Sequence, residues 1–66
     1  MTKKKEINPH ARAYDPRETA QILSLGVTTT YALIKERKLR ASKLGRRTLI
    51  TTEEIDRFLR EETVAI

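Results

Sequence analysis

The sequence predicts a mainly α-helical domain with one small β-hairpin, arranged as a winged helix-turn-helix. Three observations predict this fold. Two helix-forming segments are separated by a short turn that contains Gly26, and this spacing is typical of a helix-turn-helix unit. A segment with the pattern of a two-stranded wing follows. The last patterned stretch is amphipathic and begins with a helix-capping signal.

Length and composition limit what kind of protein this chain can be. It has 66 residues, of which 38% are hydrophobic and 35% charged, and it has no cysteine. A domain of this length buries only about 60% of the surface that its unfolded chain exposes, which leaves no room for a deep substrate cleft. Without cysteine there is neither a disulfide framework nor a zinc finger. No apolar run suits a signal peptide or a membrane span, so we expect a soluble, cytoplasmic protein.

The net charge of +5 is distributed unevenly along the chain. Residues 1–13 carry +3, residues 14–36 carry −1, residues 37–48 carry +6 and residues 49–66 carry −3. The +6 block contains no acidic residue, whereas an ordinary solvated surface mixes positively and negatively charged side chains. Such a block is typical of a face that binds phosphate groups. The alternative is that it serves only solubility.

Residues 1–13 show neither helical nor strand periodicity, so we expect a flexible basic arm there. Its lysines can reach along DNA, or the arm is a solubilising tail with no other role. His10 is the only histidine, and no carboxylate is placed to orient it, so we assign no catalytic and no metal-binding residue. The patterned domain is expected to span residues 14–62, and residues 63–66 form a short apolar tail.

The first helix is expected to begin directly after Asp15. Asp15 and Glu18 have the spacing of a capping box, and Pro16 suits the first helical position. Ala20 is small enough to let another helix approach closely. We expect this helix to end near Ser24.

A second helix is expected from about Val27 to about Arg37. Its apolar stripe should pack on the first helix, and that stripe comprises Val27, Thr30, Leu33 and Ile34. The outward side offers hydroxyl groups and a methyl group that suit base edges in the major groove of DNA. The outward residues are Thr28, Thr29, Ala32 and Lys35.

Two interpretations stay open for several of these side chains. The threonines at 28–30 also favour helix starts, where they act as capping residues. For Thr30 we favour a place in the core. The ring of Tyr31 can pack against the first helix while its hydroxyl reaches a phosphate.

The segment 39–50 predicts two short strands. Its apolar contacts are expected from Leu39, Leu44, Leu49 and Ile50. Gly45 supplies the positive φ that a tight hairpin requires, which places Arg46 and Arg47 at the tip. Together with Lys43 they are expected to hold the DNA backbone or to enter the minor groove.

The last helix is expected to begin at Thr51, which has capping-box spacing to Glu54. Three side chains should close the core, namely Ile55, Phe58 and Leu59. Four others should point to water, namely Glu53, Asp56, Arg57 and Arg60. Since DNA repels an acidic helix, we expect this helix on the far side of the domain from the second helix and the wing. Its carboxylates have no partner nucleophile and no metal-ligand spacing.

From Tyr14 to Leu59 the order of motifs resembles the excisionase family of winged helix-turn-helix proteins, which is related in fold to the DNA-binding domain of MerR-type regulators. The resemblance rests on Tyr31-Ala32-Leu33-Ile34-Lys35-Glu36, on Lys43-Leu44-Gly45-Arg46-Arg47, and on the helix from Glu53 to Leu59. Two positions depart from the family pattern: the family usually has glycine at the place of Ser24, and a serine or threonine cap at the place of Gly26. Val27 and Ala32 stand where polar residues are usual, which shifts weight from base contacts toward phosphate contacts and DNA shape.

The resemblance implies an excisionase, or recombination directionality factor, of a phage or mobile element. Such a protein is not an enzyme and uses no cofactor, metal or small-molecule substrate. It binds and bends double-stranded attachment-site DNA by cooperative self-association, and it directs a partner integrase toward excision. The residues expected to contact DNA are Thr28, Thr29, Tyr31, Ala32, Lys35, Lys43, Arg46 and Arg47. The alternatives are a transcriptional regulator of the same fold and, from another class, an adaptor whose basic face binds an acidic protein.

Overall fold

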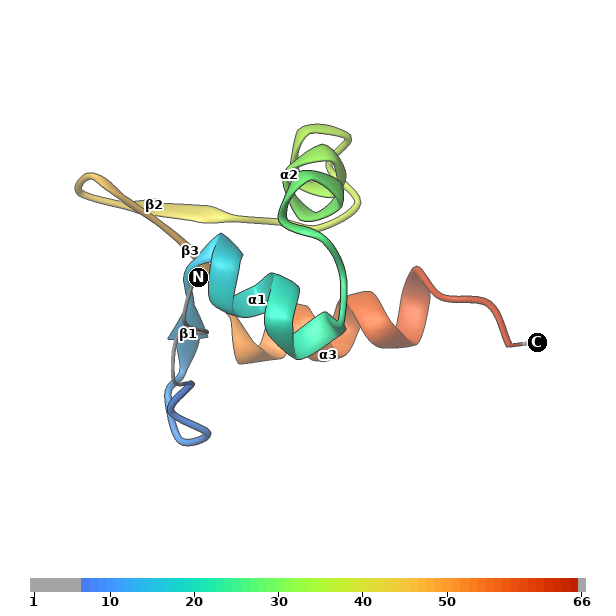
Figure 1. Cartoon of the computed structure of the whole chain (residues 1–66), viewed down its shortest axis with the longest axis horizontal. Helices are drawn as coiled ribbons and strands as arrows, with labels where there is room; N and C mark the ends of the chain where they lie inside the picture. Colours follow the sequence, from blue (N-terminus) through green and yellow to red (C-terminus); the bar gives the residue numbers. More distant parts are fainter. Residues whose placement is uncertain (1–6, 66) are drawn as a thin grey trace, which may run out of the picture.

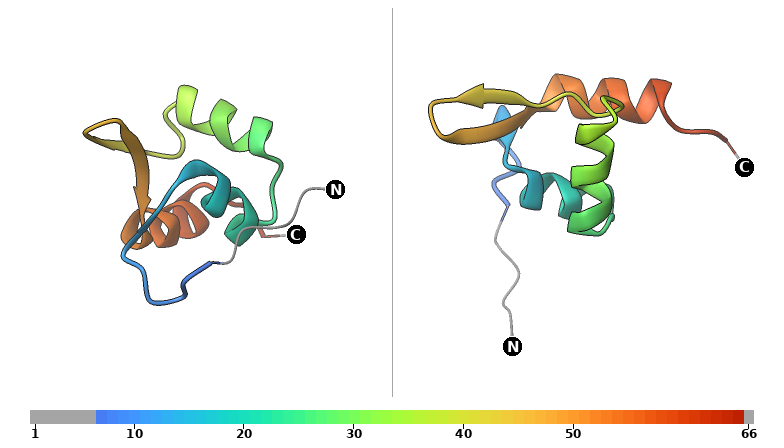
Figure 2. Two further views of the ribbon diagram at one scale, coloured as in Figure 1. Left: turned by 60° about the vertical axis from the view of Figure 1, so that its left-hand side comes forward. Right: turned by 90° about the horizontal axis from the view of Figure 1, so that it is seen from above.

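The computed structural model of the chain describes residues 7–65. Its elements are β1 (Ala13–Tyr14), α1 (Pro16–Leu23), α2 (Val27–Lys35), β2 (Ser42–Leu44), β3 (Arg47–Thr51) and α3 (Thr52–Glu61). In Figure 1 and in the left view of Figure 2, α1 lies between α2 and α3, and the β2–β3 hairpin projects beyond the helices. This arrangement confirms the mainly helical winged helix-turn-helix fold that the sequence predicts.

The start of α1 follows from local chemistry alone. The amide of Glu18 donates to Asp15 Oδ1 at 2.7 Å, and the amide of Asp15 donates to Glu18 Oε1 at 3.0 Å. Pro16 occupies the first turn, where its missing N–H costs nothing. The capping box therefore begins the helix where it was predicted. Farther along, the small Ala20 is buried, and α1 packs against α2.

The end of α1 is a Schellman motif around Ser24. The amide of Leu25 donates to the carbonyl of Ala20 at 2.9 Å, and that of Ser24 to the carbonyl of Gln21 at 3.2 Å. This pair of bonds requires a left-handed residue, which is usually glycine. Ser24 takes that conformation, with φ of 57°. The helix thus ends at the predicted place, in a conformation that serine adopts less readily than glycine.

The end of α2 repeats the same motif around Arg37. The amide of Lys38 donates to the carbonyl of Leu33 at 3.0 Å, and that of Arg37 to the carbonyl of Ile34 at 3.1 Å. Arg37 has φ of 64°, so the helix stops at Lys35. The approximate end predicted at Arg37 lies two residues beyond the observed end, because the left-handed turn comes without the glycine that signals it in a sequence.

The sheet has three strands in the order β1-β3-β2, all antiparallel. The hairpin strands were predicted, although β2 begins only at Ser42, after an irregular connection that carries Leu39. The third strand, β1, places Tyr14 opposite Ile50 and Ala13 opposite Thr51. A strand of two residues is too short to show a period of two in the sequence, so β1 was missed.

The segment that leads into β1 differs from the flexible arm that we expected. Ile7 and Ala11 pack against the core, and the hydroxyl of Tyr14 donates to the carbonyl of Asn8 at 2.7 Å. The folded part of the chain therefore extends before Tyr14. The remainder of the expected arm, residues 1–6, lies outside the described residues.

The hydrophobic core of the described residues joins side chains from β1, β3, α3 and the connection after α2. Its buried members are Tyr14, Leu39, Ile50, Ile55 and Phe58. Two polar residues, Thr19 and Thr30, are also fully buried. Thr30 lies in the core as predicted, with its hydroxyl donating to the carbonyl of Gly26 at 3.0 Å.

Three apolar residues that we expected to make packing contacts, of which only Leu59 was expected in the core itself, are exposed. Leu44 is 69% exposed because the hairpin carries it beyond the helices. Leu59 is 49% exposed, since Ile55 and Phe58 already fill the face of α3 that meets the core. Val27, the first residue of α2, is 36% exposed. Among residues 7–65, no helix is long and apolar enough to cross a membrane.

Candidate nucleic-acid interface

The outward side of α2 carries three short side chains and one lysine. Thr28, Thr29, Ala32 and Lys35 are all exposed. The N-cap of α2 is Gly26, and no side-chain hydrogen bond caps the helix, so the hydroxyls of Thr28 and Thr29 are not used to cap it. Tyr31 is half exposed. These side chains occupy the surface on which base contacts were predicted.

The hairpin turn consists of Gly45 and Arg46. Gly45 has φ of 62°, at the first central position where a type II′ turn uses glycine. Arg47 was expected in the turn, but it is the first residue of β3 and pairs with Leu44. Because a two-residue turn closes this hairpin, only Arg46 of the two arginines lies at the tip.

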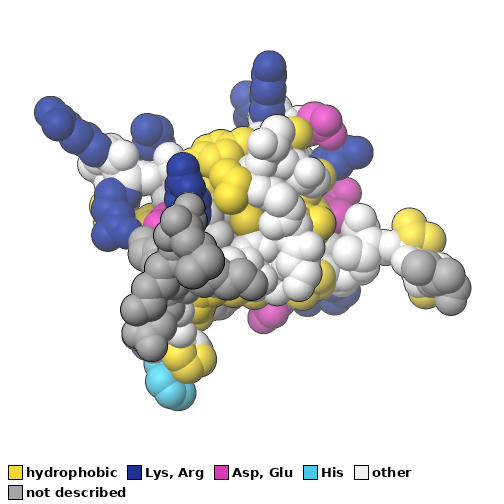
Figure 3. Space-filling view, in the orientation of Figure 1, with side chains coloured by type: hydrophobic (Ala, Val, Ile, Leu, Met, Phe, Trp, Pro, Cys, Tyr) yellow, Lys and Arg dark blue, Asp and Glu magenta, His cyan; other side chains and the backbone are white. Residues whose placement is uncertain are grey.

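The register also separates the basic side chains of the wing. Lys43 pairs with Thr48, one position along from the Leu44–Arg47 pair. Successive strand residues point to opposite faces, so Lys43 and Arg47 project from different faces of the hairpin. All three basic residues of the wing are exposed. Figure 3 shows lysine and arginine side chains standing out from the hairpin and from the region of α2.

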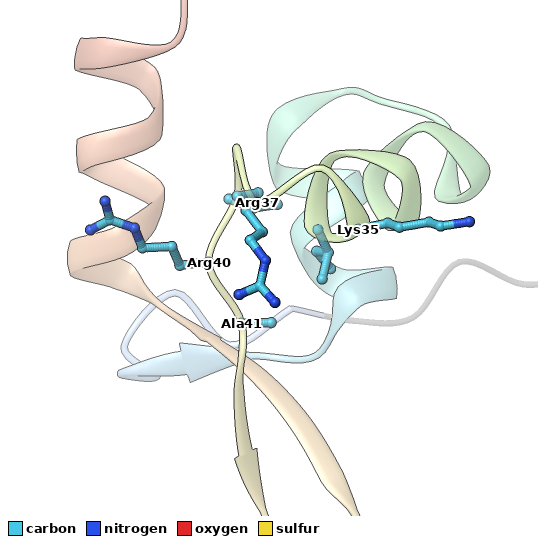
Figure 4. Close-up of a pocket in the computed structure, with 6 residues that line it drawn as sticks. Lys35, Arg37, Arg40 and Ala41 are labelled. Carbon is cyan, nitrogen blue, oxygen red and sulfur yellow. The ribbon is translucent and has the colours of Figure 1, made fainter.

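A hollow of about 630 Å³ lies where α2 meets the connection to the wing (Figure 4). We call it the junction pocket; it is lined by Ile34, Lys35, Arg37, Leu39, Arg40 and Ala41. Three of these residues are cationic and none is acidic. In Figure 4, Arg37 points along the connection toward Ala41, while Lys35 and Arg40 point to opposite sides. Of the three cations, our sequence reasoning named only Lys35 as a site residue, although all three lie within or beside the +6 block.

Arg57 and Glu54 of α3 hold the connection that forms this pocket. Arg57 Nη2 donates to Glu54 Oε2 at 2.6 Å and to the carbonyl of Lys38 at 2.9 Å. Glu54 Oε2 also accepts from the amide of Arg40 at 2.8 Å. The side chains of Arg57 and Glu54 are only 15% and 10% exposed. Our prediction that Arg57 points to water was wrong, because the connection lays its polar backbone groups against α3.

Only one half of the predicted capping box forms at the start of α3. Thr51 Oγ1 accepts from the amide of Glu54 at 3.1 Å, as predicted. The carboxylate of Glu54 bonds to Arg57 and Arg40 instead of completing a capping box. The hydrogen bond from Arg57 lowers the pKa of Glu54, and the amide and charge of Arg40 act in the same direction. The same pair raises the pKa of Arg57, so it stays charged at any ordinary pH.

This pair predicts a pH dependence of stability. The pKa of Glu54 is lower in the folded state than its ordinary value of 4.5. The contribution of its carboxylate to the free energy of unfolding is therefore complete when the pH is above that ordinary pKa. It is lost as pH falls through the folded-state pKa. We expect Glu54→Gln to lower the free energy of unfolding at pH 7 and to make its decline between pH 6 and pH 3 shallower. Urea unfolding at several pH values measures both effects.

The matched control is Glu53→Gln, at the exposed neighbouring position. Within residues 7–65, Glu53 makes no ion pair, so this variant should keep the pH dependence of the wild type. Equal pH dependence of all three proteins would contradict a stabilising role for Glu54.

Among residues 7–65, no group of three histidine, cysteine, aspartate or glutamate side chains is placed so that it could hold a metal ion.

The comparison with known families agrees with this geometry. A family model described as a helix-turn-helix domain matches residues 13–63. No curated protein and no solved structure matches the chain significantly. The matched range runs from β1 past the end of α3 and includes the α1–α2 pair and the wing. The chain therefore belongs to the helix-turn-helix domain family, and it is a DNA-binding domain of that fold.

Proposed function

We propose that this DNA-binding domain is an excisionase, which binds and bends attachment-site DNA cooperatively and directs an integrase toward excision. The observation that carries the proposal is the contrast between its two contact surfaces. The wing presents cations on both faces, whereas the outward side of α2 presents mainly hydroxyl and methyl groups. Such a surface favours contacts to the DNA backbone and to DNA shape over direct reading of base sequence.

The wing is suited to hold a deformed duplex. Lys43 and Arg47 project from opposite faces of the hairpin, with Arg46 at its tip. A hairpin placed in the minor groove in this way offers a cation to each of the two strands that border the groove. Proteins that bend DNA recover the cost of deformation through additional backbone contacts of this kind.

The salt dependence of binding tests the phosphate contacts. If about five to seven phosphates are neutralised, the logarithm of affinity should fall with the logarithm of salt concentration at a slope near −5. Fluorescence anisotropy on a labelled duplex between 50 and 300 mM salt measures the slope. An affinity that does not depend on salt would contradict the proposed DNA interface.

Thr29 is proposed to contribute to the choice of DNA sequence. We expect Thr29→Ala to reduce the discrimination between the target duplex and a mismatched one by up to ~5-fold, because a single hydroxyl supplies less than the 1–3 kcal/mol of a bidentate contact. The slope with salt should stay unchanged. Competition binding with both duplexes measures the ratio, and Thr63→Ala, near the C-terminus, is the control. A preserved ratio in Thr29→Ala would show that α2 does not read bases through this residue.

The decisive test of the function compares excision with transcription. With an integrase and a plasmid that carries attachment sites, the protein should increase excision, and footprinting should show contiguous repeated sites. A change of promoter output without integrase, together with a single footprint, would identify a transcriptional regulator instead. Failure to bind duplex DNA at low salt, with binding to an acidic protein retained, would identify an adaptor.

A further inference from the structure

We propose that the junction pocket binds one phosphate of the DNA backbone and that Arg37 is its principal ligand. The proposal rests on the proposed DNA binding and adds a third contact between α2 and the wing. Neither the outward side of α2 nor the wing includes Arg37. Three independent features of the structure support the assignment.

The first feature is the backbone of Arg37. This residue occupies the left-handed position of a Schellman motif, with φ of 64°, where glycine is the most favourable residue. Within residues 7–65, its side chain makes neither a hydrogen bond nor an ion pair that would offset the strain. Strained positions of this kind cluster where a side chain is needed for function.

The second feature is the distribution of charge around the pocket. Close by, Lys38 pairs with Glu36 at 3.5 Å, and Arg57 pairs with Glu54. The positive charge of Arg40 also acts on Glu54 and helps to lower its pKa. In contrast, the described part of the chain holds no ion pair to Arg37 or to Lys35. Of these two cations, Arg37 is the one whose side chain points along the connection toward Ala41 (Figure 4), so it is the uncompensated cation best placed to bind an anion in the pocket.

The third feature is the position and rigidity of the pocket. One strand of the DNA backbone separates the major groove from the neighbouring minor groove. If α2 occupies the first groove and the wing the second, that strand crosses the connection between them, which is where the pocket lies. Arg57 and Glu54 bond to the backbone of residues 38 and 40, so the wall of the pocket is held in place before DNA arrives.

The substitution Arg37→Gly separates binding from folding. It removes the proposed phosphate ligand and, at the same time, relieves the left-handed strain. We expect it to reduce the salt slope by about 1 for every duplex. The ratio of variant affinity to wild-type affinity should therefore be about eightfold lower at 0.1 M salt than at 1 M salt. The midpoint of urea unfolding should stay the same or rise. A mutation that weakened binding by damaging the fold would lower that midpoint.

The matched control is Ser24→Gly, which relieves the same strain at the end of α1 without changing charge. This variant should raise the unfolding midpoint and leave affinity and salt slope unchanged. A second binding variant, Arg37→Gln, keeps a side chain at the strained position and should reduce the slope as Arg37→Gly does. Anisotropy titrations of the three variants and the wild type on one labelled duplex measure these effects.

The outcomes separate this proposal from the function on which it rests. If the wild type does not bind duplex DNA at low salt, the DNA-binding function itself fails. If the wild type binds and both Arg37 variants keep its affinity and slope, the junction pocket is not a phosphate site, while the proposed function stands. A slope reduced by about 1 in both variants, with no change in Ser24→Gly, supports the site.

Discussion

Replacing Leu39 by alanine is expected to unfold a large part of the protein population. Leu39 is 0% exposed and packs with Ile50 and Phe58 in the one core cluster. A leucine-to-alanine change at such a position costs about 2–5 kcal/mol. A domain of this size has a total stability of only about 3–10 kcal/mol, taking 0.05–0.15 kcal/mol per residue. Circular dichroism during urea unfolding should show a much lower midpoint or no cooperative transition.

The same substitution at Leu44 is the control, because Leu44 is 69% exposed on the wing. Leu44→Ala should change the free energy of unfolding by less than about 0.5 kcal/mol. Equal effects of the two substitutions would contradict the position of Leu39 in the core. Leu39 also belongs to the lining of the junction pocket. Because its side chain carries no charge, its loss should weaken DNA binding by destabilising the fold and should not change the number of phosphate contacts.

Removing both arginines of the wing is expected to cause the largest loss of DNA binding that leaves the fold intact. Each neutralised phosphate contributes about 0.9 to the salt slope. The double variant Arg46→Ala, Arg47→Ala should therefore reduce the salt slope by about 2. The ratio of its affinity to that of the wild type should be about 60-fold lower at 0.1 M salt than at 1 M salt. Both side chains are exposed, so the unfolding midpoint should change little. Titrations on target and unrelated duplexes should show equal losses, since phosphate contacts carry no sequence information.

Arg60→Ala is the control for the change in total charge. Arg60 is exposed on α3 and lies near Glu61, at 3.8 Å, and it belongs neither to the wing strands nor to the lining of the junction pocket. Its removal should leave the salt slope unchanged. If it reduced the slope by as much per charge as the wing variant does, binding would depend on net charge alone and the wing would have no special role.

Much of the fold could be predicted because it is encoded in short stretches of sequence. The capping box of Asp15 and Glu18 marks the start of α1, and Thr51 marks the start of α3. Gly45 specifies the hairpin turn through its positive φ. Each signal acts over a few residues, so it can be recognised without knowing where the remainder of the chain lies.

The candidate site was predicted less completely. The exposed threonines of α2 and the cations of the wing follow from helical and strand periodicity. The junction pocket does not, because Arg37 and Arg40 lie in an irregular connection whose shape has no periodic pattern. Their only sequence signal is the unbalanced charge of residues 37–48.

The sequence by itself determined the order of the elements, the capped helix starts, the hairpin turn and the concentration of positive charge after α2. Only the tertiary structure decided which apolar side chains are buried and which charges are paired. Leu39 and Leu44 are the same residue type, yet one is in the core and the other on the wing. Arg57 looks like a surface residue on its own helix, yet its side chain is only 15% exposed, because a connection 19 residues away in sequence supplies the carbonyl of Lys38. Burial and charge pairing depend on such distant partners, and packing alone brings those partners together.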